Sequence, residues 1–175
     1  ETLEFESETY SKAIVAYQNL FVSAKNNFDK AILLNAISRC FLKANNPDEA
    51  VKVYDRLAQN YSDVSNPSGV PFGIIAHFQA GNILFELGNF EKSSVQLFNL
   101  LEDIFKPRWS LTKTQFYIYL NKTKDLIQAM REKTAEIIDG EALEQEWAGF
   151  LRLEEDRTQW MNRIELLVQN SIPKI

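Results

Sequence analysis

The sequence of 175 residues contains one cysteine and one histidine, and these two shortages exclude several kinds of site. The single thiol, Cys40, can form neither an internal disulfide nor a thiolate metal cluster. The single imidazole, His77, cannot by itself build a histidine-based zinc site. We therefore predict no metal and no cofactor. Cys40 is expected to be a buried, inert thiol, and His77 a contact between two helices.

Catalytic motifs are also missing from the sequence. It contains no Gly-rich phosphate loop, no Gly-x-Ser-x-Gly, no His-Glu-x-x-His and no Cys-x-x-Cys. Paired carboxylates such as Glu102 and Asp103 fall on an expected helix surface, where acids are ordinarily solvated. We predict that this stretch of chain is not an enzyme.

Basic charge and long apolar runs are scarce as well. The net charge of −5 argues against a nucleic-acid partner. No apolar run approaches the ~18 residues of a membrane span, so a membrane would be reached only through flanking segments. The chain has 45% hydrophobic residues but only 6 glycines and 5 prolines, which indicates a globular domain.

Helical spacing of apolar residues dominates the sequence, and the predicted fold is therefore all-α. Asn46 followed by Pro47 and Glu49 is a strong helix start. Thr112 and Gln115 form a capping box, while residues 60–71 are rich in turn formers and predict a surface loop. Seven helices are expected, at about 7–24, 29–44, 47–61, 71–87, 90–106, 112–137 and 140–171.

Three segments repeat one pattern of small and large residues. Each has a small residue, a large apolar residue four positions later, and another three positions after that. The three sets are Ala13, Tyr17 and Leu20; Ala50, Tyr54 and Leu57; and Ser93, Leu97 and Leu100. The small residue allows two helices to approach closely, and the large ones fill the space beside it. We expect Ala13, Ser38, Ala50 and Gly81 at helix crossings, with Tyr17, Phe41, Tyr54, Leu57, Leu84, Phe98 and Leu101 buried.

The repeats resemble the tetratricopeptide (TPR) pattern of antiparallel helix pairs with a small residue in each helix and a short turn such as Gly88–Asn89. The copies are 37 and 43 residues apart instead of 34, so they are degenerate. An irregular helical bundle is the alternative. We expect repeats over residues 1–106, with residues 1–6 at most the tail of a missing first helix. Residues 107–175 would form two long helices, packed on the repeats in one continuous domain.

A TPR array turns the first helix of each pair toward its concave face. The predicted concave stripe consists of Asn35, Arg39 and Lys43, with Asn82 in the next pair. Its cations could hold a carboxylate or a peptide terminus. The alternative is a solvated helix face.

Residues 104–124 form a second candidate, because they contain five cations and no acid. Aromatic residues interleave with these cations, and helical spacing favours burial for part of them. The candidate ligand contacts are Arg108, Trp109, Lys113 and Tyr117. A ligand there would be anionic or would carry a planar apolar group.

The expected last helix, 140–171, has a broad apolar face interrupted at Glu154 and Arg157. That face could pack on the repeats or on the same helix of a second copy, which would make a homodimer. A signal could pass as a shift of this helix against the repeats.

Residues 106–120 carry a second resemblance, through an Arg108–Trp109 pair followed by Leu111, Thr112, Lys113, Phe116, Tyr119 and Leu120. The segment is similar to one that follows TPR-like units in the extracytoplasmic part of some bacterial membrane-bound sensor histidine kinases. The resemblance implies a sensor region on the periplasmic side of an inner membrane, with the kinase core elsewhere in the protein. The alternative is a cytoplasmic TPR scaffold. In either setting the partner of this domain would be a peptide, a protein or a small anionic ligand.

Overall fold

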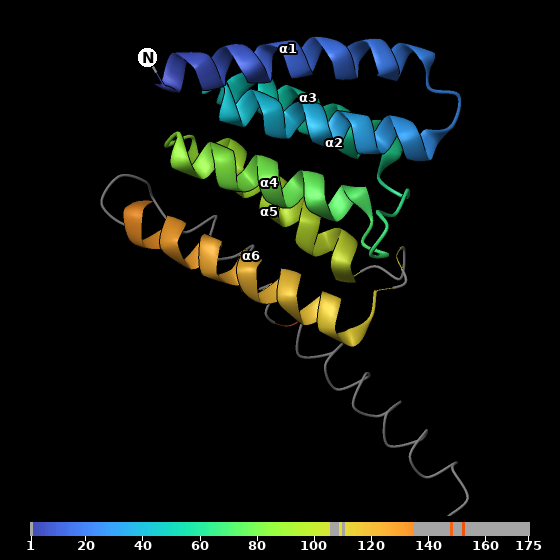
Figure 1. Ribbon diagram of the computed structural model, residues 1–175. Helices are drawn as coiled ribbons and strands as arrows, with labels where there is room; N and C mark the ends of the chain where they lie inside the picture. The colour runs from blue at the N-terminus through green and yellow to red at the C-terminus, as the bar shows by residue number, and fades with distance from the viewer. Residues whose placement is uncertain (1, 106–108, 110, 135–147, 149–151, 153–175) are drawn as a thin grey trace, which may run out of the picture. The chain divides into compact units, whose positions relative to one another are not determined.

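The computed structural model describes residues 2–105, 109, 111–134, 148 and 152. Six helices and no strand are found within these residues, which confirms the all-α prediction (Figure 1). The helices are α1 (Thr2–Ser23), α2 (Asn27–Lys43), α3 (Pro47–Tyr61), α4 (Phe72–Glu86), α5 (Phe90–Phe105) and α6 (Lys113–Thr134). The predicted helix 140–171, its break at Glu154 and Arg157, and its role in a homodimer lie outside the described residues.

The chain divides into two compact units, Glu1–Met130 and Arg131–Ile175. Nearly all described residues belong to the first unit, which holds α1 to α5 and most of α6. The division falls inside α6, whereas the sequence predicts that the repeats end at residue 106. Residues 107–130 therefore belong to the same compact unit as the repeats.

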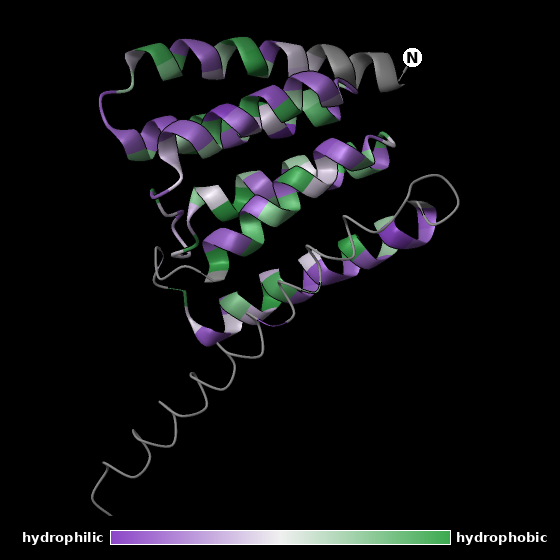
Figure 2. Ribbon diagram, turned by 180° about the vertical axis from the view of Figure 1, so that it is seen from behind, coloured by the Kyte–Doolittle hydropathy of each residue, from purple (hydrophilic) through white to green (hydrophobic). Residues whose placement is uncertain are grey.

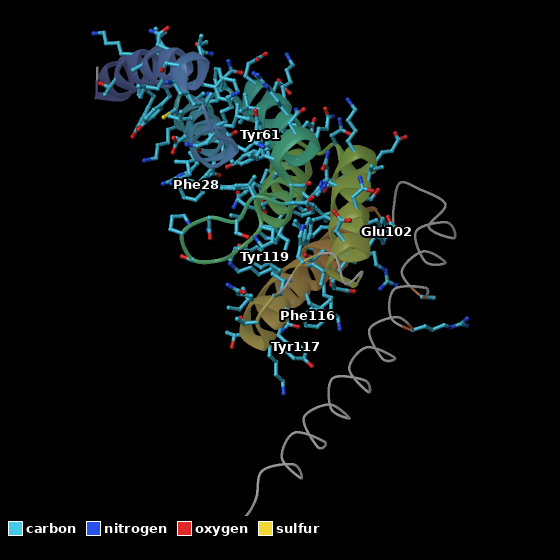
Figure 3. All side chains as sticks on the ribbon, turned by 90° about the vertical axis from the view of Figure 1, so that its right-hand side faces the viewer. Phe28, Tyr61, Glu102, Phe116, Tyr117 and Tyr119 are labelled. Atoms are coloured by element: carbon cyan, nitrogen blue, oxygen red, sulfur yellow. The ribbon has the colours of Figure 1, made fainter. Side chains whose placement is uncertain are left out.

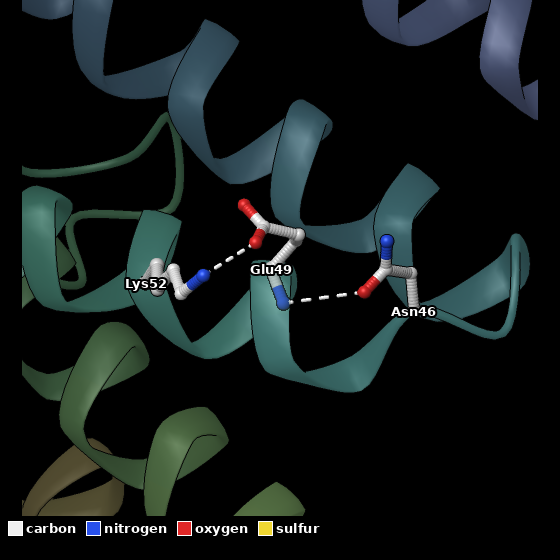
Figure 4. Close-up of polar contacts among 3 residues, drawn as sticks. All are labelled: Asn46, Glu49 and Lys52. Atoms are coloured by element: carbon white, nitrogen blue, oxygen red, sulfur yellow. Dashed lines mark hydrogen bonds and ion pairs between the residues drawn. The ribbon is translucent and has the colours of Figure 1, made fainter.

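Local signals set the helix ends. At α3 the Asn46 side chain accepts a hydrogen bond from the Glu49 amide at 3.4 Å, and Glu49 in turn pairs with Lys52 at 2.5 Å (Figure 4). At α6 the capping box forms in both directions, because Thr112 accepts from the Gln115 amide and Gln115 accepts from the Thr112 amide. Each cap satisfies amides that the first helical turn leaves without a partner.

Successive helices pack as a stack of hairpins, in which α1 contacts α2, α2 contacts α3, α3 contacts α4 and α4 contacts α5 (Figure 1). One hydrophobic core runs through the middle of the stack. It consists of Ala31, Leu34, Ala50, Tyr54, Leu57, Phe72, Ala76, Ala80 and Ile83. The core thus joins α2, α3 and α4 into one body.

The crossings follow the small residues. Ser38 and Ala50 are fully buried. A methyl group on Gly81 would lie 2.7 Å from Leu97 Cδ2, and Ser93 Oγ donates to the Gly81 carbonyl oxygen at 2.7 Å. The backbone of α4 at Gly81 therefore contacts side chains of α5, because glycine has no side chain to keep the helices apart.

Some burial predictions were wrong. Tyr54, Leu57, Leu84 and Leu101 are buried, whereas Tyr17, Phe41 and Phe98 are only half-buried. Phe41 packs at the edge of the core, and Phe98 lies beside the buried stripe of α5. Residues 2–6 are also not the tail of a separate helix, because α1 continues unbroken from Thr2 to Ser23.

Helix α6 lies against α4. The rings of Phe78 and Tyr119 meet edge to face with centroids 6.2 Å apart, and Lys122 Nζ lies 5.9 Å from the centre of the Phe78 ring. Burial raises the pKa of Tyr119. The face of α4 that carries Phe78 is therefore partly covered by α6.

Candidate binding groove

A groove of about 310 Å³ runs between α1 and α2. One wall comes from half-buried and exposed positions of α1, and the other from the C-terminal half of α2. Its lining consists of Thr9, Tyr10, Ala13, Tyr17, Ala36, Arg39, Cys40 and Lys43. Alanines at its middle leave room for a ligand. This volume is at the lower end for small-molecule pockets.

Two predicted site residues meet in this groove. Arg39 and Lys43 stand one helical turn apart on α2, and both are exposed. Lys43 Nζ lies 5.2 Å from the centre of the Tyr10 ring, so the ring face helps to hold the ammonium group over the groove. The groove thus offers two cations and two tyrosine rings to an anion.

The remaining predicted stripe residues lie elsewhere. Asn35 is half-buried on α2 and does not line the groove, and Asn82 is half-buried on α4. Only the cationic half of the predicted concave stripe contributes to this groove.

Cys40 is half-buried and lines the groove, so the prediction of a buried thiol was wrong. Partial burial raises the pKa of the thiol, and the nearby charges of Lys43 and Arg39 act in the opposite direction. The thiol consequently stays protonated at neutral pH and adds a weakly polar surface to the groove.

The second candidate, the cations and aromatic residues of 104–124, is here called the junction, and its tryptophan has a structural role. Trp109 is only 8% exposed, its indole Nε1–H donates to Asp63 at 2.9 Å, and its ring packs on Gly73. The predicted ligand contact at Trp109 is therefore not supported, because the ring is buried. Trp109, which lies between α5 and α6, therefore packs against the 62–71 loop and the start of α4.

Neither of the two described grooves is lined by Trp109, Lys113 or Tyr117. Lys113 is exposed at the first position of α6, and Tyr117 is half-buried with its ring edge to face with Phe116 at 5.2 Å (Figure 3). Arg108 lies outside the described residues. The predicted junction site is thus represented by an exposed cation and a partly covered ring.

A second groove, of about 660 Å³, lies between α3 and α5. Beside it a chain of polar contacts crosses three helices: Gln96 Nε2 donates to Asp55 Oδ1 at 2.8 Å, and Gln96 Oε1 lies 2.8 Å from His77 Nδ1. His77 is thus a helix contact, as predicted. Burial raises the pKa of Asp55, although Gln96, His77 and Lys92 oppose that shift. Three residues so far apart in sequence give no local signal of this arrangement.

Comparisons with family models, with curated proteins and with solved structures find no match to this chain. In the described part of the chain, no group of three or more His, Cys, Asp or Glu side chains could hold a metal ion. None of the described helices is both long enough and apolar enough to span a membrane. The candidate site is therefore defined by the residues that line the α1/α2 groove.

Proposed function

We propose that this chain is a non-catalytic binding module, and that it takes an anionic ligand in the α1/α2 groove. The observation that carries the proposal is that Arg39, Lys43, Tyr10 and Tyr17 line one groove, with Lys43 over the Tyr10 ring. An arginine fork and an ammonium group together match a carboxylate, and ring faces accommodate apolar atoms next to it. The ligand class is a carboxylate-bearing molecule such as a peptide.

The biological setting that we propose is the extracytoplasmic sensor region of a bacterial membrane-bound histidine kinase. Residues 106–120 support it by their similarity to that class of receptor. A cytoplasmic scaffold would use the same groove for a peptide or protein. The full reading frame distinguishes the two, because membrane spans on both sides of these residues favour the sensor and further helical repeats favour the scaffold.

The binding proposal is tested with amide chemical shifts of the isotope-labelled protein during titration with acetate and with an N-acetylated dipeptide. We expect shifts confined to α1 and α2. Arg39→Ala and Lys43→Ala should each weaken binding about fivefold, which corresponds to the ~1 kcal/mol of an exposed ion pair. Lys30→Ala is the matched control, because Lys30 is a cation of α2 that does not line the groove. Shifts scattered over other helices, or equal effects of all three variants, would contradict the proposal.

A further inference from the structure

The three repeated patterns are buried to very different degrees. In α3, Ala50 and Leu57 are 0% exposed and Tyr54 is 1% exposed; in α5, Ser93, Leu97 and Leu100 are all 0% exposed. In α1 the equivalent Ala13 and Tyr17 are half-buried, and Leu20 is 53% exposed. These three residues of α1 define what we call the seat. The seat has the residues of a helix crossing, and none of the described helices crosses it as α2 crosses α3.

A preceding helix covers the equivalent positions in the other two hairpins. Helix α2 supplies Ala31 and Leu34 to the same core as Ala50 and Tyr54. Helix α4 brings Gly81 against Leu97 and accepts a hydrogen bond from Ser93. What fits against this pattern of a small and two large residues is therefore an α-helix with a small residue at its centre.

Exposure elsewhere on α1 does not require a partner. Hydrophobic residues recur along this helix (Figure 2), and Val15 and Val22 are 56% and 84% exposed. The positions equivalent to Val15 are Lys52 and Val95, and both of these are exposed as well. Val15 and Val22 thus belong to the solvent side of the hairpin, whereas the seat lies at positions that are buried in the other two copies.

The seat also extends beyond the α1/α2 groove. Ala13 and Tyr17 line that groove, whereas Leu20 does not. The stretch from Tyr10 to Leu20 is about 15 Å long, at 1.5 Å per helical residue. A small anion in the groove would not reach Leu20, whereas a helix of three or four turns would cover the groove and Leu20 together.

The hairpin geometry gives the direction of such a helix, and the charges of α2 agree with it. In the hairpins the covering helix runs antiparallel to the covered one, so its C-terminal end would lie near Tyr10, beside Arg39 and Lys43. A helix C-terminus carries partial negative charge, and acidic side chains in its last turns add to that charge. Both complement the two cations of α2.

From these observations we infer that the seat binds an amphipathic α-helix of a partner protein, with a small residue at its centre and carboxylates toward its C-terminal end. This inference rests on the proposed function and names the ligand of the same groove. The covering helix would bury Leu20 and Tyr17 and would pair with Arg39 and Lys43.

Two stapled peptides test the inference. Both are built on residues 27–43, the helix that covers α3, with serine in place of cysteine. One carries glutamate and the other lysine at the four charged positions of that segment. We expect the full chain to bind the glutamate peptide at least tenfold more tightly than the lysine peptide in fluorescence anisotropy.

Substitutions in the seat test whether the glutamate peptide binds there. Leu20→Asp and Ala13→Trp should each weaken binding of the glutamate peptide by tenfold or more, because they charge or fill the seat. Val15→Asp and Val22→Asp are matched controls on the same helix and should leave binding within about twofold. Circular dichroism of each variant shows whether the fold is kept, and a variant that loses helical signal is replaced by Leu20→Ser.

The outcomes separate this inference from the proposed function. Binding of acetate with no binding of either peptide would refute the partner helix but would still support anion binding in the α1/α2 groove. Peptide binding that is lost in Arg39→Ala but unchanged in Leu20→Asp would do the same. Self-association of the free protein that Leu20→Asp abolishes would assign the seat to a second copy and overturn the partner helix. If neither acetate nor peptide binds, both proposals fail.

Discussion

Helix α1 and helix α3 carry the same pattern of small and large residues, yet only the pattern of α3 is buried. Leu57 of α3 is 0% exposed and Leu20 of α1 is 53% exposed. The difference teaches that a repeat pattern records what a helix can pack against, whereas its neighbours decide how much surface it buries. Because burial of apolar surface dominates the free energy of folding, equivalent substitutions in the two helices should have unequal effects.

Truncation of the third residue of the pattern should give the largest contrast. Leu57→Ala removes a fully buried side chain and should lower the free energy of unfolding by ~2–5 kcal/mol. Leu20→Ala should change it by less than ~0.5 kcal/mol, because half of the leucine is already in water. Urea unfolding followed by circular dichroism measures both. A cost of ~2 kcal/mol or more for Leu20→Ala would mean that Leu20 is covered in solution.

Enlarging the small residue should give the next contrast. Ala50→Leu overpacks a closed crossing and should destabilise the protein by ~1–3 kcal/mol. Ala13→Leu extends into the open groove and should be close to neutral. Thermal unfolding of the two variants beside the parent protein measures the difference. Equal destabilisation would show that the groove at Ala13 is closed.

Local features of the fold were predictable from the sequence, because they depend on residues a few positions apart. Asn46 and the Thr112–Gln115 pair set helix ends within one or two residues of those predicted. The repeat spacing also identified Gly81 and Ala50 as crossing residues. Short-range hydrogen bonds and helical periodicity carry this information without reference to the rest of the chain.

Long-range contacts explain what could not be predicted. Trp109 looked like a ligand contact because it stands among cations, but it is held by Gly73 and Asp63, which lie far from it in sequence. The α1 wall of the groove was missed for a similar reason. Tyr10 and Tyr17 read as ordinary packing positions, and only the arrangement of the hairpins reveals that they flank an open groove. The cations Arg39 and Lys43 were found because a helix face follows from spacing alone.

Loss of the helix cap should lower stability by a similar amount at α2 and at α3. Asn26 accepts from the Asp29 amide at the start of α2, and Asn46 accepts from the Glu49 amide at the start of α3. Since a cap acts only on its own first turn, Asn26→Ala and Asn46→Ala should each cost ~0.5–2 kcal/mol. Urea unfolding tests this directly. A much larger effect at Asn46 would show that the cap also supports packing at a distance.

The smallest effect should be a pH dependence that belongs to α3 and not to α1. Asp55 is half-buried, and burial raises its pKa above the ordinary value of 3.8. The folded protein therefore binds this proton more tightly than the unfolded chain does. The contribution of Asp55 to stability is therefore most favourable below pH 3.8, falls as the pH rises through the raised pKa, and stays lower above it.

Asp55→Asn should remove this loss, because its side-chain oxygen can still accept from Gln96 without carrying a charge. The variant should be at least as stable as the parent protein at pH 7, and its relative advantage should disappear in acid. The repeat supplies the control: the position equivalent to Asp55 in α1 is Gln18, which is exposed. A carboxylate placed there by Gln18→Asp loses little hydration on folding, so it should not introduce a matching fall in stability. Urea unfolding from pH 3 to pH 7 measures all three proteins, and a constant difference between Asp55→Asn and the parent across that range would refute the contribution of Asp55.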